Sequence, residues 1–264
     1  MEEKQRRQRY LNRRRTLKKR RGRRDTVSIT ILVVSLVVLL FAASQLIISL
    51  SPYLTGSKEY NQLRELVLTA DEVGDGFTID FDMLLNENPD TVAWLRFEEP
   101  EIISYPVVQG EDNSEYLTKT FSANDNKLGA IFMDVRNTSF EDRNVFIYGH
   151  NLKVGGEMFS QLNAYAEEEF CKEHPCFFIY TPDGKVRAYK VFSAGVVKAT
   201  ADNYKSAYRT EENFIDYLNL CKNSSNYNVD VELNTKSKIV TLSTCTNVRS
   251  DERFLVQGVL VSED

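Results

Sequence analysis

The alternation of hydrophobic and polar positions divides the chain into three parts. The first 26 residues are polar, whereas residues 27–50 form an apolar run interrupted only by serine, threonine and Gln45. As a helix, this run would be about 36 Å long at ~1.5 Å per residue, which suffices to cross a bilayer core with some tilt. We therefore expect a single transmembrane anchor over 27–50, a linker over 51–57 and a folded domain over 58–264.

Helical periodicity opens the folded domain. Leu63, Leu66 and Val67 recur at i, i+3 and i+4 spacing within residues 58–71, as on one face of a helix. A second, shorter helix is expected around Phe81, Leu84 and Leu85, which would share one face, before the turn "NENPD". Residues 58–90 are thus predicted to be an N-terminal helical region.

The rest of the domain has the sequence pattern of a β protein. Short apolar runs alternate with turn residues, and "TPDGK" supplies the Asp-Gly pair that favours a hairpin turn. Strands are expected near residues 92–97, 103–109, 129–134, 144–149, 176–181, 186–197, 237–243 and 253–261, with helices at 158–170 and 211–220. Many short strands with few helices predict a mainly β fold, a closed or nearly closed barrel with peripheral helices. Periodicity alone does not separate a barrel from a sandwich.

The distribution of charge predicts how the apolar segment is oriented across the membrane. Residues 1–26 contain 13 Lys/Arg and 3 Asp/Glu, while the remainder contains 20 and 35, respectively. By the positive-inside rule, the basic segment is a cytoplasmic tail and the residues after about 51 lie outside the cell. The basic run then acts as a topology signal at a membrane, and nucleic acid is not an expected partner.

The chain has only two histidines and four cysteines, which makes the search for a histidine–cysteine pair short. His150 ends the apolar run "NVFIYGH", Cys245 follows "KIVTLST", and Arg253 opens the next apolar run eight residues later. A thiolate stabilised by cationic neighbours is nucleophilic, an imidazole moves protons, and an arginine can hold a carbonyl or an oxyanion. From spacing alone, Cys245 is a buried small hydrophobe, half of a disulfide, a metal ligand or a nucleophile.

The other cysteines suggest no cofactor. Cys171, His174 and Cys176 are close in sequence, but structural zinc sites use four ligands, usually in two pairs, and a second pair is missing from the sequence. A disulfide between Cys171 and Cys176 remains an alternative outside the cell. Cys221 lies at the end of an amphipathic helix and is expected in the core. No Walker, dinucleotide or calcium-loop motif occurs, so neither a metal nor an organic cofactor is expected.

Several ordered motifs resemble those of the class B sortases, membrane-anchored cysteine transpeptidases of Gram-positive bacteria. They are "YPVVQGEDNSEYL", "GAIFMDVRN", "NVFIYGHN", "YTPDG" and "TLSTC" followed by an arginine. The resemblance covers roughly residues 60–262 and implies an eight-stranded sortase-type barrel. It also implies that His150, Cys245 and Arg253 are the catalytic residues.

The resemblance leaves some assignments open. Arg249, four residues after Cys245, competes with Arg253 for the arginine role. Ser243, Thr244 and Asn247 are candidate substrate-binding residues, with the alternative that they satisfy backbone groups at a strand end. The segment 198–232 is the expected wall that sets specificity.

The resemblance implies a reaction and its partners. The thiolate would cleave a C-terminal, Pro-containing sorting motif of a secreted protein, and the resulting thioester would be transferred to an amine of a lipid II-type peptidoglycan precursor. A sorting-motif hydrolase, a pilin-polymerising sortase and a catalytically silent peptide-binding module remain alternatives.

Overall fold

The computed structural model describes the chain except residues 71–76, 102 and 153–154, with backbone only for 17–26 and 68–70. Two compact units are present, Met1–Ser51 and Pro52–Asp264. The first consists of helix α1 (Glu2–Val67), which continues into the second. The stretch of this helix from Val27 is long and apolar enough to span a membrane. Residues 51–57, expected as a linker, are helical, with Pro52 inside the helix.

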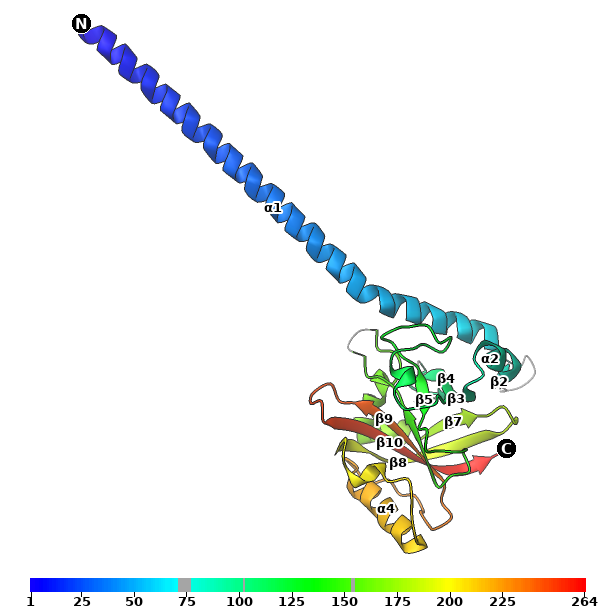
Figure 1. Cartoon of the computed structure of the whole chain (residues 1–264). Helices are drawn as coiled ribbons and strands as arrows, with labels where there is room; N and C mark the ends of the chain where they lie inside the picture. Colours follow the sequence, from blue (N-terminus) through cyan, green and yellow to red (C-terminus); the bar gives the residue numbers. More distant parts are fainter. Residues whose placement is uncertain (71–76, 102, 153–154) are drawn as a thin grey trace. The chain divides into compact units, whose positions relative to one another are not determined.

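The second unit is built on a closed β-barrel, as predicted (Figure 1). In the described part of the chain its eight strands follow the order β10-β8-β7-β3-β4-β5-β6-β9. They are β3 (Thr91–Phe97), β4 (Ser104–Val108), β5 (Ile131–Met133), β6 (Asn144–Tyr148), β7 (Cys176–Tyr180), β8 (Val186–Lys198), β9 (Ile239–Cys245) and β10 (Glu252–Glu263). Each corresponds to one predicted strand. A short hairpin of β1 (Leu68–Ala70) and β2 (Phe77–Ile79) was not predicted.

Alternating burial explains why these runs form a barrel. Along the first half of β8, buried residues such as Tyr189 alternate with partly exposed ones, so one face points inward. Phe177 stacks on Tyr189 inside the barrel, with ring centroids 5.4 Å apart. Gly258 on β10 lets the two rings pack close to the strand, because a Cβ there would lie 2.5 Å from the Phe177 ring. The register of β10 against β8 shifts at this point.

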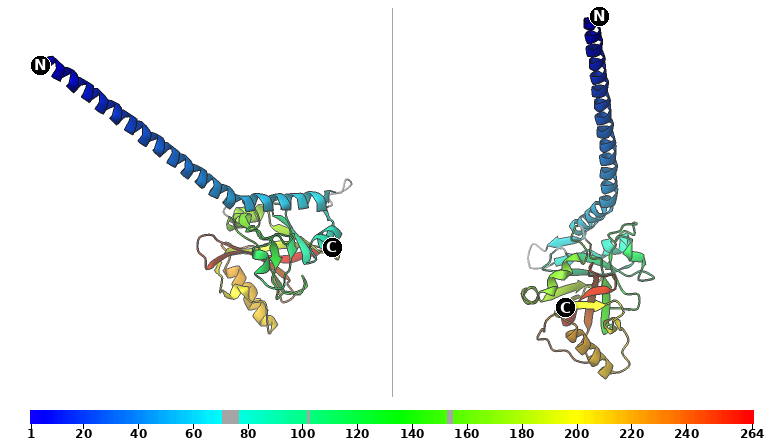
Figure 2. Two further views of the ribbon diagram at one scale, coloured as in Figure 1. Left: turned by 45° about the horizontal axis from the view of Figure 1, so that its top comes forward. Right: turned by 90° about the vertical axis from the view of Figure 1, so that its left-hand side faces the viewer.

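Helices cover the outside of the barrel (Figure 2). The structure contains α2 (Phe81–Glu87), α3 (Glu168–Glu173) and α4 (Glu211–Asn223), and the 3₁₀ helices η1 (Glu115–Leu117), η2 (Ser160–Ala166) and η3 (Asp202–Tyr204). Helix α4 begins at the cap residue Thr210, whose side chain accepts a hydrogen bond from the Asn213 amide at 3.1 Å. It buries Phe214 and Cys221 against the barrel, which confirms the core position expected for Cys221.

The single helix expected over 158–170 is wrong. The chain forms η2 and then α3, because Glu167 between them has extended backbone angles, φ −96° and ψ 125°. The disulfide alternative is not realised either: the structure describes all four cysteines, and Cys171 and Cys176 are free thiols.

Candidate active site

The ends of three strands bring the predicted reactive residues to one rim of the barrel. β6 and β9 are parallel neighbours, with Tyr148 opposite Ser243. His150 comes two residues after the end of β6, and Cys245 is the last residue of β9, so both lie at the same edge of the barrel. β10 returns antiparallel to β9, with Arg253 directly opposite Cys245. The cross-strand proximity of Cys245 and Arg253 expected from the sequence is therefore confirmed.

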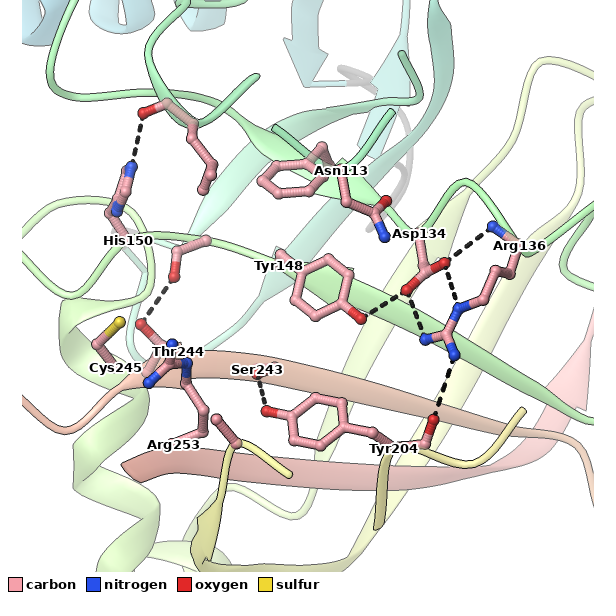
Figure 3. A pocket seen from close by; sticks show the side chains of 14 residues that line it. Asn113, Asp134, Arg136, Tyr148, His150, Tyr204, Ser243, Thr244, Cys245 and Arg253 are labelled. Atoms are coloured by element: carbon pink, nitrogen blue, oxygen red, sulfur yellow. Dashed lines mark hydrogen bonds and ion pairs between the residues drawn. The ribbon is translucent and has the colours of Figure 1, made fainter. Parts of the chain in front are cut away.

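All three residues line one cavity of about 430 Å³ (Figure 3). Its lining is Asn113, Leu117, Phe132, Asp134, Arg136, Tyr148, Gly149, His150, Ala199, Tyr204, Ser243, Thr244, Cys245 and Arg253. From the predicted specificity segment 198–232, only Ala199 and Tyr204 belong to this set. Arg249 lies outside it, with a side chain that is 62% exposed and paired with Asp251.

Side-chain hydrogen bonds fasten the end of β9 to the segment that carries His150. Thr244 donates from Oγ1 to the Gly149 carbonyl, and Asn151 donates from Nδ2 to the Cys245 carbonyl, each at 2.7 Å. Asn247 donates from Nδ2 to the Asn151 carbonyl, also at 2.7 Å. These bonds extend the β6–β9 pairing beyond the last strand residues, and they fix the backbone of Cys245 relative to that of His150.

The three residues predicted to contact substrate have different positions. Ser243 and Thr244 line the cavity but are buried, and Ser243 Oγ is hydrogen-bonded to the Tyr204 hydroxyl at 2.7 Å. Asn247 is exposed, with φ +60°, and is absent from the described lining. Thr244 and Asn247 thus bind backbone carbonyls near the strand ends, whereas Ser243 binds the side chain of Tyr204.

The imidazole of His150 is held by a backbone carbonyl and packs against a glycine. Its Nε2 is 2.7 Å from the Leu117 carbonyl oxygen, and because a carbonyl oxygen only accepts, Nε2 carries a proton in this arrangement. Gly129, with φ +69°, lies against the ring: a Cβ there would be 2.8 Å from His150 Cδ2. The carbonyl and the glycine together set the direction of the ring.

The Arg253 guanidinium is held beside the thiol by its own loop. Nη1 donates to the carbonyls of Ser250 and Glu252, both at 2.8 Å. In Figure 3 the guanidinium lies next to Cys245 on the cavity wall. A fixed cation at this point can stabilise a thiolate or negative charge that develops on a bound carbonyl.

An ion pair that sequence reasoning missed forms the opposite wall. Asp134 is fully buried and accepts from Arg136 Nη2 at 2.8 Å and from the Tyr148 hydroxyl at 2.6 Å. Burial disfavours the charged carboxylate, but the hydrogen bonds from Arg136 and Tyr148 outweigh it and lower the pKa of Asp134 to about 2. Burial and the bond to Asp134 raise the pKa of Tyr148. The motif "GAIFMDVRN" contains two of these residues, yet nothing in its pattern indicates the pairing.

Comparisons with known proteins agree with this geometry. A family model described as Sortase domain matches residues 98–261. Sortase B of Listeria monocytogenes serovar 1/2a (strain ATCC BAA-679 / EGD-e) is 36% identical over 181 residues, 67% of this chain and 72% of the relative. Sortase B of Staphylococcus aureus (strain NCTC 8325 / PS 47) is 32% identical over 186 residues, 69% of this chain and 74% of the relative. The X-ray structure of Clostridium perfringens sortase B superposes with a TM-score of 0.66 at 30% identity, covering 69% of this chain and 100% of that one.

Proposed function

Because the chain belongs to the sortases, with class B members as its relatives, we propose that Cys245, His150 and Arg253 carry out the cysteine transpeptidase reaction of the family. One observation carries the proposal: Arg253 is the register partner of Cys245, and His150 follows the parallel neighbouring strand, so that all three line one cavity. This shared position supports the proposal that the three residues act together.

The first half-reaction forms a covalent intermediate. The Cys245 thiolate attacks a backbone carbonyl carbon within the sorting motif, the peptide C–N bond breaks, and the departing amine takes a proton from His150. A thioester remains on Cys245. Splitting one difficult step into two easier ones is the general advantage of covalent catalysis.

The second half-reaction releases the product. An acceptor amine attacks the thioester carbonyl, gives up a proton to His150 and expels the thiolate, which restores the free enzyme. In both steps Arg253 holds the substrate backbone or the oxyanion, whereas Arg249 is turned toward Asp251 and Glu252. The geometry therefore favours Arg253 over Arg249.

We further propose where the reaction takes place and with which partners. The apolar helix anchors the protein, with residues 1–26 in the cytoplasm and residues 58–264 outside. The substrate is a secreted protein with a Pro-containing C-terminal sorting signal, and the acceptor is an amine of a lipid-linked peptidoglycan precursor. Holding enzyme, substrate and precursor at one membrane surface raises their effective concentration.

A product analysis tests this proposal. Full-length protein in detergent would be incubated with Pro-containing sorting peptides, with and without oligoglycine or a diaminopimelate-containing peptide. A ligated product that appears only with an amine supports transpeptidation. Hydrolysis without ligation to any amine would favour the hydrolase alternative, and absence of cleavage across the panel would favour the peptide-binding module.

A further inference from the structure

The membrane-proximal part of α1, residues 52–67, forms hydrogen bonds with the loop whose backbone holds the His150 imidazole. Tyr60 is 2% exposed, and its hydroxyl donates to the Gly129 carbonyl at 2.9 Å and accepts from the Phe121 amide at 3.0 Å. Burial raises the pKa of Tyr60 well above its ordinary value, so the hydroxyl stays protonated and remains a donor. One side chain therefore joins two points of this loop that are eight residues apart.

The loop, here called the histidine loop, comprises residues 117–130, from the last residue of η1 to the residue before β5. Its first residue supplies the carbonyl that binds His150 Nε2, and Gly129 near its end lies under the imidazole ring. The amide of Ala130 donates to the Tyr116 carbonyl at 3.0 Å, which draws the two ends together. The position of the imidazole therefore depends on how this loop is held.

Other contacts from the same helix reach the same loop. Glu59 accepts a hydrogen bond from the Ser122 amide at 3.1 Å, and Asn126 donates from Nδ2 to the Pro52 carbonyl at 2.9 Å. Tyr60 differs from these two contacts because it is buried and binds the carbonyl of the residue that touches the imidazole. A buried hydrogen-bonding group that loses its partner is costly to leave unpaired, so removal of the Tyr60 hydroxyl would force Gly129 and Phe121 to find other partners.

We propose that Tyr60 is a positioning residue for His150, through which the membrane-proximal helix forms part of the catalytic apparatus. Tyr60 fixes Gly129 and Phe121, Gly129 and Leu117 fix the imidazole, and the imidazole then faces the rim that carries Cys245. The inference rests on the proposed catalytic role of His150, but its first link, from Tyr60 to the ring, is measurable without turnover.

The test compares Tyr60→Phe with Tyr165→Phe in the full-length protein. Tyr165 is a matched control because it is fully buried and its hydroxyl donates to a backbone carbonyl, that of His174, at 2.8 Å. With selective ¹⁵N-histidine labelling, the two histidines of the chain give two imidazole spin systems. His174 serves as the internal reference in Tyr60→Phe, whereas in Tyr165→Phe, which loses the bond to the His174 carbonyl, the readout is that the His150 signals stay in place. Tyr60→Phe is expected to shift the His150 signals, while the His174 signals stay in place.

Activity provides the second readout. A ring displaced by a fraction of an ångström should lower kcat by ~10-fold to 100-fold, with a small change in KM and a displaced pH profile, whereas Tyr165→Phe should retain kcat. Unchanged His150 signals in Tyr60→Phe would overturn the inference, whatever the activity. Shifted His150 signals with an unchanged kcat would support the role of Tyr60 in positioning the imidazole, but would contradict the catalytic role proposed for His150.

Discussion

Gly129→Ala should disable the enzyme while leaving it folded. Gly129 has φ +69°, and an added Cβ would lie 2.8 Å from His150 Cδ2, 3.1 Å from its Nε2 and 3.0 Å from the Tyr116 carbonyl oxygen. The carbonyl belongs to the backbone and yields little, so the imidazole must move. Carbon atoms pack at about 3.5 Å or more, so the ring must shift by about 0.7 Å, which disrupts its 2.7 Å contact with the Leu117 carbonyl.

Two free energies follow from this geometry. A left-handed backbone conformation costs a residue with a Cβ roughly 1–2 kcal/mol, equivalent to about 2–8 °C in Tm for a domain of this size. Misplacing a catalytic group by about 1 Å costs on the order of 100-fold in rate, or about 2.7 kcal/mol of transition-state stabilisation. The loss of activity should therefore exceed what the loss of stability alone would cause.

The assay pairs kcat/KM for a fluorogenic sorting peptide with Tm, and uses Gly184→Ala as the control. Gly184 has φ +84° but no atom within 4 Å of an added Cβ, so it has the backbone strain without the clash. The control should lose similar stability and keep its activity. Equal activity losses in the two variants, or wild-type activity in Gly129→Ala, would refute the reasoning.

Three further predictions concern charge and topology. Arg253→Ala should lower kcat/KM by about 100-fold to 1000-fold, as removal of an oxyanion donor does, while Arg249→Ala should stay within a few-fold; the reverse would move the arginine role to Arg249. The folded-state pKa of Asp134, about 2, lies below its unfolded value of about 3.9, so its stabilisation is full above about pH 4 and lost as pH falls through 2. Asp134→Asn should therefore cost about 2–3 kcal/mol at pH 7 and progressively less toward pH 2 in denaturant titrations, and a pH-independent cost would contradict this assignment. Protease added to intact protoplasts should digest the folded domain, and protection of that domain would reverse the proposed orientation.

The strands could be predicted from sequence because they are apolar runs punctuated by turns, whereas the choice of a closed eight-stranded barrel over a sandwich depended on the resemblance to the sortases. The eight-residue spacing from Cys245 to Arg253 likewise predicted neighbours across a short connection, and the register places them opposite each other. The β1–β2 hairpin escaped prediction because its strands have three residues each. The break at Glu167 also escaped it, because an apolar periodicity fits one helix as well as two short ones.

Parts of the site depend on contacts between distant segments. Tyr60 and Gly129 are 69 residues apart, and Tyr148 and Asp134 belong to different strand ends, so local patterning cannot pair them. Ser243 and Thr244 were predicted as candidate substrate-binding residues, next to the cysteine. Their hydrogen-bond partners, Gly149 after β6 for Thr244 and Tyr204 of η3 for Ser243, are known only from the folded structure.

The central claim is that Cys245 forms a thioester with the sorting motif. Intact-protein mass spectrometry of the full-length enzyme, quenched in acid after mixing with a cognate peptide, measures this directly. The account predicts an added mass equal to the N-terminal peptide fragment, located on Cys245, removed by hydroxylamine and absent from Cys245→Ala. Cleavage by Cys245→Ala at the wild-type rate, or an adduct on another residue, would contradict it.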